Sequence, residues 1–436
     1  MNLSSRLARK KGSCESLHRS FNVLVIDEWP PLPANSGRTI RTWGLLERLA
    51  RRHKISMLCY SDPDTEPCKL MRAAEITVHA VPPFREHRGI ALYCDLLANT
   101  LSRFPYSVWK HFTPRFHEQL RNLLKREQFD VVHCECTPYA RFLDAAVKTP
   151  RLVMAHNIES QILLRRAQTS HSMTERVFFN LQARKMEAFE RRVFAEADWV
   201  TTVSQLDADC ARAWGARQVS LVENGVDQEY FAPTRNLSSE NGILFLASLD
   251  WYPNLDALDY LLEEILPLIE REKPGIKLRI VGRRPSAVMR ERIAGRSNVE
   301  LVGEVADVRP FLSQAGVVVV PLRIGGGSRI KIIEALSMAK AVVSTSIGAE
   351  GLEVRDGEHL LIADSPSDFA RRTIEALASP ELRLCLGEKG RKLAVERYSW
   401  DRMALALEWA WEQVSGVKNF SEPMASPVGA QGESST

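Results

Sequence analysis

Short apolar runs recur along this chain, and most of them are followed by a segment with helical periodicity. Two examples are Phe21–Asp27 and Val317–Pro321, which are almost wholly apolar. Continuous apolar runs of this length are typical of parallel strands that helices cover on both faces of a sheet. The same pattern predicts strands at Ile55–Tyr60, Ile76–Val81, Phe129–Cys134, Leu152–Ala155, Asp198–Val203, Val219–Val222, Ile243–Ser248, Lys277–Val281, Val299–Val302, Ala341–Thr345 and His359–Ile362.

The alternation of strands and helices runs twice, with a polar, turn-rich stretch at 233–242 between the two rounds. This predicts an α/β protein with two doubly wound Rossmann-like domains that face each other across a cleft. We expect a basic disordered segment at 1–20, a first domain at 21–235 and a second domain at 236–398. A helix at 399–416 is expected to cross back to the first domain, before a disordered tail at 417–436.

The helical periodicity predicts helices at Thr39–Arg52, 90–127, 159–195, Asn254–Ile269, Ala287–Ala294, Val308–Ala315, Ser328–Ala339, Pro366–Ala378, Pro380–Arg397 and Trp400–Val414. In doubly wound sheets, ligands bind beyond the carboxyl ends of the strands. Functional residues are therefore expected in the loops that follow the strands.

The composition argues against several function classes. The net charge of +4 is small for a dedicated nucleic-acid binder. The eight cysteines include no CxxC pair and fit a reducing compartment. No signal peptide and no run of about 20 apolar residues is present, so we expect a cytoplasmic protein without a membrane-spanning helix.

The region after the apolar run at Val317–Pro321 has the properties of an anion site. Three glycines, Gly325–Gly327, allow close approach to the backbone, and Ser328 is predicted to cap the helix that follows. The free N–H groups and the dipole at a helix start favour an anion. Arg329 and Lys331 add positive charge where the helix already favours negative charge, which a polyanionic ligand would explain.

Glu334 follows Lys331 by three residues and lies on a neighbouring part of the helix surface. Its carboxylate could accept hydrogen bonds from a diol such as a ribose, or it could simply pair with Lys331. In that second interpretation Arg329 and Lys331 are solvated surface groups. The glycine spacing matches neither a Walker loop nor the GxGxxG dinucleotide motif, which argues against a dinucleotide-dependent dehydrogenase.

A family resemblance adds to this interpretation. The donor-side segment at 317–348 and five others, in the same order, resemble motifs of family 4 retaining glycosyltransferases with the GT-B fold. The other segments are Asn35–Arg38 with Pro30 and Pro31, His156–Glu159, Thr202–Ser204, Asn224–Asp227 and Gly348–Gly351. The variant motifs resemble a subgroup from bacterial surface-polysaccharide pathways. The resemblance implies that the first domain binds an acceptor and the second a nucleotide-sugar donor.

The implied reaction moves a hexosyl group from a nucleoside diphosphate, of UDP or GDP type, to an acceptor hydroxyl with retention, using no metal and no cofactor. The resemblance assigns catalytic roles to His156, Arg329 and Lys331. It assigns donor binding to Gly37, Arg283, Gly326, Gly327, Ser328, Glu334 and Glu350.

Two departures from the family pattern keep rival functions open. Gly326 stands where many members carry a first glutamate, and the loop Leu249–Asn254 lacks a basic pair. A non-catalytic nucleotide-sugar-binding protein and a nucleotide-sugar epimerase therefore remain alternatives. The expected partners are a nucleotide sugar, a saccharide or lipid-linked acceptor and, through the basic helical region 159–195, an anionic membrane surface, but no nucleic acid.

Overall fold

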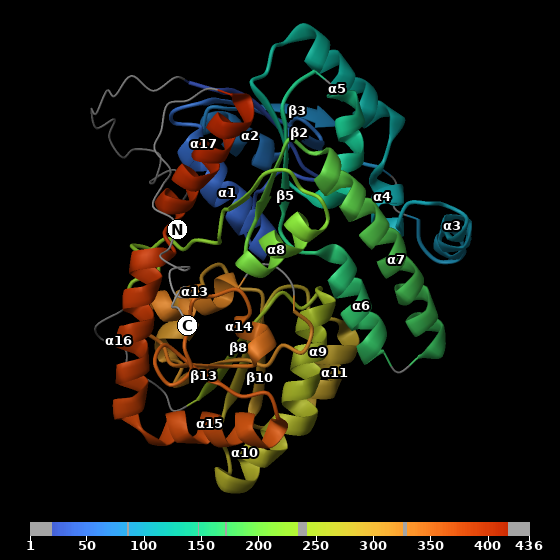
Figure 1. Cartoon of the computed structure of the whole chain (residues 1–436). Coiled ribbons are helices and arrows are strands. Elements are labelled where there is room, and N and C mark those ends of the chain that lie inside the picture. Colours follow the sequence, from blue (N-terminus) through green and yellow to red (C-terminus); the bar gives the residue numbers. More distant parts are fainter. Residues whose placement is uncertain are drawn as a thin grey trace, which may run out of the picture.

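The computed structural model describes residues 20–84, 87–146, 148–170, 172–233, 242–325 and 329–416. These residues form two α/β domains, each built on a parallel sheet (Figure 1). The predicted disordered segments at 1–20 and 417–436 lie outside the described residues except for Ser20. Most of the predicted linker, residues 234–241, also lies outside them.

The first sheet has the order β3-β2-β1-β4-β5-β6-β7, with all neighbours parallel. Its order reverses between β1 and β4, so the loops after these two strands open at a topological switch point. The strands are β1 Asn22–Ile26, β2 Lys54–Tyr60, β3 Ile76–Val81, β4 Val131–Cys134, β5 Arg151–Ala155, β6 Trp199–Thr202 and β7 Val219–Leu221.

The second sheet repeats this arrangement with the order β10-β9-β8-β11-β12-β13, again parallel throughout. Its reversal falls between β8 and β11. The strands are β8 Ile243–Leu246, β9 Leu278–Val281, β10 Val299–Gly303, β11 Val317–Val320, β12 Val342–Ser344 and β13 Leu361–Ile362. The prediction of two doubly wound parallel sheets is confirmed.

Helices cover both faces of each sheet. In the first domain they are α1 Gly37–Leu49, α2 Glu66–Ala73, α3 Ile90–Thr100, α4 Tyr106–His111, α5 Pro114–Arg126, the 3₁₀-helix η2 Thr137–Ala145, α6 Glu159–Thr169, α7 Met173–Glu196 and α8 Gln205–Ala213. In the second they are α9 Tyr252–Tyr260, the π-helical η3 Leu261–Ile265, α10 Leu266–Glu272, α11 Ala287–Ala294, α12 Arg309–Gln314, α13 Ile330–Ser337, α14 Ser346–Ala349, α15 Pro366–Ala378 and α16 Pro380–Arg397.

Three predicted helical regions are interrupted in the structure. Region 90–127 forms three helices, because Pro105 and Pro114 each begin a new helix instead of continuing the last. Region 159–195 forms α6 and α7, with Ser172 capping the second. The predicted helix Asn254–Ile269 widens into the π-helical segment just before Pro267, whose ring nitrogen cannot donate a helical hydrogen bond.

The last helix, α17 (Trp400–Ser415), leaves the second domain and lies along the first, where Figure 1 shows it in red beside α1. Its apolar face joins the core formed by α1 and one face of the first sheet. Polar contacts hold the same interface, including Arg48 Nε to Asp401 Oδ1 at 2.7 Å and His53 Nε2 to Glu408 Oε1 at 2.9 Å. The chain therefore crosses between the domains twice.

Trp400, the first residue of α17, packs where the two domains meet. A Cβ added to Gly44 of α1 would lie 2.8 Å from its indole, and one added to Gly225 would lie 2.7 Å from it. These glycines are therefore required for space, because neither position tolerates a side chain without moving the indole.

Gly44→Ala is expected to lower the free energy of unfolding despite its position inside a helix. Alanine in a helix gains about 1 kcal/mol over glycine, but overpacking against Trp400 costs about 1–3 kcal/mol. Urea denaturation measures the net change. Gly295→Ala is the control, because its added Cβ meets no atom within 4 Å. A Gly44→Ala protein more stable than this control would contradict the packing argument.

Candidate active site

A cleft of about 1240 Å³ opens between the carboxyl ends of the two sheets. From the first domain, the loop after β1, the start of α1 and the residues after β5 reach its wall. From the second domain, the loops after β8 and β9 and the first turns of α13 reach it. Of the predicted site residues, the cleft brings together Gly37, His156, Arg283, Arg329, Lys331 and Glu334.

The helix at the predicted anion site begins later than expected. Arg329 takes the N-cap position and α13 starts at Ile330, so the prediction that Ser328 caps this helix is wrong. The helix also ends at Ser337 instead of Ala339, because Ala339 adopts a left-handed conformation with φ 54°. Gly326, Gly327 and Ser328 lie outside the described residues.

Arg329 is buried in the cleft wall, and Lys331 is half-buried there. The Arg329 guanidinium donates to the carbonyl of Ile347 at 2.9 Å and to Glu350 Oε2 at 3.4 Å. Burial lowers the pKa of Arg329 to about 10. Lys331 Nζ donates to Asn254 Oδ1 at 2.8 Å, and burial, with the nearby Arg329, lowers the pKa of Lys331 to about 7.

Glu334 lies one helical turn from Lys331. Burial raises the pKa of its carboxyl to about 8, against the opposing attraction of Lys331. Arg329 and Lys331 therefore bring two positive charges to the cleft wall, beside Glu350 and Glu334 respectively. A polyanion entering the cleft would restore to Arg329 and Lys331 the stabilisation that burial has removed.

Glu350 does not lie on the cleft wall as a sugar contact, but between the two domains. Arg165 of α6 donates to both of its oxygens at 3.3 Å, while Arg329 contacts the same carboxylate from the second domain. A side chain on Gly325 would collide with this arrangement, since an added Cβ would lie 2.5 Å from Arg165 and 2.9 Å from Glu350. Glu350 therefore acts on the cleft through Arg329.

Arg283 follows β9 and spans the cleft. Its guanidinium contacts Asp250 Oδ2 at 3.2 Å and donates to Asn35 Oδ1 of the first domain at 3.2 Å. Asn35 precedes the capping residue Ser36 and Gly37, the first residue of α1. Asp250 belongs to the loop that lacks a basic pair, so Arg283 supplies positive charge at that position from another strand.

His156 follows β5 and contacts Glu135, which in turn contacts His133; the sequence analysis singled out neither Glu135 nor His133. His156 Nε2 is 3.3 Å from Glu135 Oε1, and His133 Nε2 is 3.0 Å from Glu135 Oε2. His133 and Glu135 interrupt an otherwise apolar run around β4, at alternating positions. That polar alternation at a strand end was the available sign of a functional cluster.

Asp27 directly follows β1 and lies near the same cluster. Burial raises the pKa of its carboxyl to about 6, although its ion pair with Arg38 at 3.0 Å acts to lower it. Arg38 also contacts Glu28 at 3.3 Å. The first-domain wall thus carries several buried ionisable groups. Among the residues described, no cluster of His, Cys, Asp or Glu has the arrangement of a metal site.

Comparison with known families now identifies the fold and its general activity. A family model described as "Glycosyltransferase Family 4" matches residues 36–230, and one described as "Glycosyl transferases group 1" matches residues 240–379. The chain belongs to the family 4 glycosyltransferases. The two matched ranges correspond to the two GT-B domains of this glycosyltransferase.

Individual relatives agree with this identification. The phosphatidyl-myo-inositol mannosyltransferase of Mycobacterium tuberculosis is 27% identical over 324 residues, which cover 70% of this chain and 79% of that protein. A protein of Klebsiella pneumoniae, named "Uncharacterized 44.6 kDa protein in cps region", is 22% identical over 81% of this chain and 90% of its own length.

The solved structures agree on the fold. Anabaena Alr3699/HepE, crystallised with UDP and glucose, superposes with a TM-score of 0.64 at 11% identity. The superposition covers 89% of this chain and 98% of that one. At this identity the likeness supports the GT-B fold alone.

Diphosphate affinity of this glycosyltransferase is expected to fall as the pH rises from 7 to 9. A bound anion favours protonated Lys331 and raises its pKa, so affinity is greatest below the free-state pKa of about 7 and declines above it. The decline is at most about tenfold per pH unit for one proton. Calorimetric titration with UDP measures it.

Lys331→Arg is the control for this pH dependence. An arginine remains charged through this range, so the fall in affinity should flatten while the ionisation of UDP itself stays the same. Equal slopes for the wild type and Lys331→Arg would show that Lys331 does not take up the proton.

Proposed function

We propose that this glycosyltransferase moves a hexosyl group from a nucleoside diphosphate sugar to an acceptor hydroxyl with retention of anomeric configuration. The observation that carries the proposal is the pair of cations at the start of α13 in the interdomain cleft, the buried Arg329 and the half-buried Lys331. Such a pair at a helix N-terminus suits a diphosphate.

In the proposed reaction, the bond between the anomeric carbon and the diphosphate oxygen breaks as the acceptor oxygen bonds to the same face. Negative charge develops on the leaving diphosphate, where Arg329 and Lys331 are already oriented to stabilise it. The acceptor proton passes to the leaving phosphate oxygen. The side-chain cations supply the charge stabilisation, so the proposal includes no metal and no cofactor.

The remaining predicted residues take supporting roles. Glu334 accepts hydrogen bonds from the ribose diol, and Arg283 contacts the base or the phosphates from the end of β9 on the same wall. Gly37, Gly326, Gly327 and Ser328 are assigned to backbone contacts with the donor. His156 faces the departing phosphate or the acceptor hydroxyl. UDP is the first nucleotide to test, since HepE was crystallised with it.

Arg329→Ala is expected to weaken UDP binding by tenfold or more, because a charge-assisted hydrogen bond contributes about 1.5–3 kcal/mol. The shift in melting temperature at a series of UDP, GDP, ADP and dTDP concentrations measures affinity and selects the base. Arg371→Ala on α15 is the control, since Arg371 is an exposed arginine of the same domain.

Three outcomes separate the proposal from its rivals. Unchanged affinity in Arg329→Ala would refute the diphosphate assignment. Nucleotide binding without sugar transfer to any acceptor would favour a non-catalytic protein. Conversion of the donor sugar without an acceptor would favour an epimerase.

For the acceptor, we propose a lipid-linked saccharide, used in bacterial polysaccharide or glycolipid assembly at the cytoplasmic surface of an anionic membrane. Among the described residues, no helix is long and apolar enough to span a bilayer. Helix α3, however, stands out from the edge of the first domain (Figure 1), and it exposes one apolar stripe. The stripe consists of Ile90, Tyr93, Leu97 and Leu101, which are 71–93% exposed.

Helix α7 extends this surface. Lys185 donates to the carbonyl of Asn99 at 2.7 Å and so joins α7 to the end of α3. Met173, Val177 and Leu181 are exposed along α7, and the exposed Arg88, Arg103 and Arg184 provide positive charge near the two helices. A convex apolar ridge with basic neighbours fits insertion among anionic lipid head groups.

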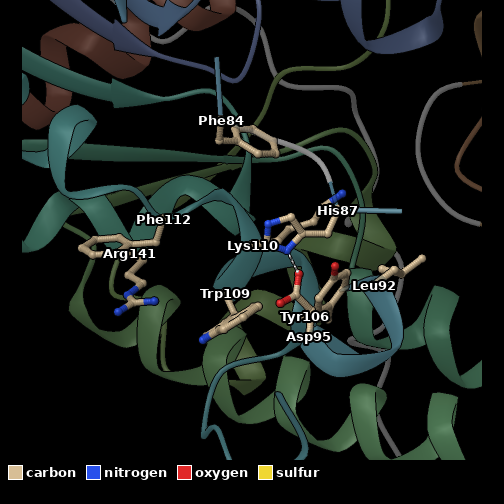
Figure 2. A pocket seen from close by; sticks show the side chains of 9 residues that line it. All are labelled: Phe84, His87, Leu92, Asp95, Tyr106, Trp109, Lys110, Phe112 and Arg141. Atoms are coloured by element: carbon tan, nitrogen blue, oxygen red, sulfur yellow. Dashed lines mark hydrogen bonds and ion pairs between the residues drawn. The ribbon is translucent and has the colours of Figure 1, made fainter. Parts of the chain in front are cut away.

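A pocket of about 500 Å³ lies beside α3, which contributes Leu92 and Asp95 to its lining. Figure 2 shows its aromatic side chains, Phe84, Tyr106, Trp109 and Phe112, together with Lys110 and Arg141. Arg141 stacks 3.7 Å from the centre of the Phe112 ring, which orients its charge. This combination suits the phosphate and first apolar carbons of a lipid.

The double variant Tyr93→Ser/Leu97→Ser is expected to lose binding to vesicles of phosphatidylglycerol by tenfold or more, because it removes two large apolar contacts with the bilayer. Co-sedimentation measures the binding, which should also weaken at high salt. Leu384→Ser on α16 is the control, since Leu384 is 63% exposed in the second domain. The proposal that this surface contacts an anionic membrane would be refuted if the double variant bound as well as the wild type, or if neutral vesicles bound as well as anionic ones.

A further inference from the structure

A carboxylate lies buried directly behind His156. Glu135 is 1% exposed, and its two oxygens contact two imidazoles, Oε1 that of His156 and Oε2 that of His133. Thr42 of α1 donates to Oε1 at 2.9 Å, and the backbone N–H of Glu135 donates to the carbonyl of Ile26 at 2.9 Å. The side chain is therefore fixed by three neighbouring elements, β4, β5 and α1.

The contact on the far side of His133 defines which ring nitrogen carries its proton. The indole N–H of Trp411, on α17, donates to His133 Nδ1 at 3.3 Å. A nitrogen that accepts a hydrogen bond carries no proton, so neutral His133 has its proton on Nε2, the atom facing Glu135. Trp411, His133, Glu135 and His156 thus form one line from the C-terminal helix to the cleft.

Charged groups around this line explain why the carboxylate stays ionised. Burial acts to raise the pKa of Glu135, but its contacts with His133 and His156 outweigh burial and hold that pKa well below its usual range. Arg41 of α1 adds positive charge nearby, while Asp27 at the end of β1 adds negative charge when ionised. Arg41 is itself fixed by the carbonyl of Glu223 at 2.5 Å and by Asn224 Oδ1 at 3.1 Å.

We propose that Glu135 is a positioning residue for His156, and that the Trp411–His133 contact extends this control to the C-terminal helix. Glu135 holds the Nε2 edge of His156, leaves Nδ1 as the ring nitrogen for a ligand in the cleft, and stabilises the imidazolium form. A protonated His156 then donates from Nδ1 to an anionic oxygen.

This inference rests on the proposed function only for its consequence in the reaction. With a nucleoside diphosphate sugar in the cleft, the Nδ1 proton of His156 would stabilise the charge that develops on the leaving oxygen. The position and protonation of His156 themselves can be measured with no substrate present.

Glu135→Gln tests the proposal, since glutamine keeps the size of the side chain and its bond to Thr42 but removes the charge. NMR of ¹⁵N-labelled histidine reports the titration and tautomer of His156, and His156→Gln assigns its signal. We expect His156 to titrate about one pH unit or more lower in Glu135→Gln. An unchanged titration and tautomer would overturn the proposal, because a purely structural role would leave both unchanged.

Transfer activity provides the second measurement. In Glu135→Gln, kcat should fall by about 100-fold, with its pH profile displaced in the same direction as the His156 titration and with little change in KM for the donor. If the His156 titration is displaced in Glu135→Gln but the wild-type protein transfers no sugar, the proposed function is wrong and the positioning role of Glu135 is still supported.

A pair of tryptophans on α17 tests the far end of the line. Trp411→Phe removes the indole N–H that His133 accepts, and it should relax the His133 tautomer and displace the His156 titration by a smaller amount. Trp409→Phe is the matched control, because Trp409 packs edge-on against Trp199 and contacts neither histidine. Equal titrations in the two variants would remove Trp411 from the proposal.

Discussion

The packing of α17 against the first domain is the interaction on which the rest of the molecule depends. A single linker would leave two Rossmann-like domains free to rotate, because interdomain surfaces of this kind are small and polar. Here the chain returns, and α17 buries Trp411 and its neighbours in the core of the domain that it did not come from. A hydrophobic interface therefore joins the two domains in addition to the linker.

The walls of the cleft carry charged side chains that are partly or wholly buried. Arg329 is buried and Lys331 is half-buried, and burial lowers the pKa of both side chains. On the first-domain wall, contacts with His133 and His156 hold the pKa of Glu135 well below its usual range although the carboxyl is buried.

The sequence predicted most strands and helices of the fold and several residues that line the cleft, but not the contacts among the residues at the site. Strands were predictable because burial on both faces makes them continuously apolar. Helix α2 was missed because only Cys68 and Met71 of its eight residues are buried, so its periodicity is weak. Cys68, one of these two buried residues, also donates a hydrogen bond to Ser61.

The roles of Glu135 and Glu350 could not be predicted, because each depends on contacts between distant segments. Arg165 and Glu350 are 185 residues apart in the sequence, and Trp411 is 278 residues from His133. No local pattern encodes such pairings. The family resemblance assigned Glu350 to donor binding but gave no sign of its ion pairs with Arg165 and Arg329.

The position of Glu350 has a thermodynamic consequence. Arg165 and Arg329 share this carboxylate from opposite domains, so separating the domains would leave Glu350 to Arg329 alone and reduce the attraction of Arg329 for a phosphate. The closed arrangement is thus the one in which Arg329 is most available to an anion. By the reciprocity of linked equilibria, an anion bound at Arg329 must stabilise closure by the same free energy that closure adds to its binding.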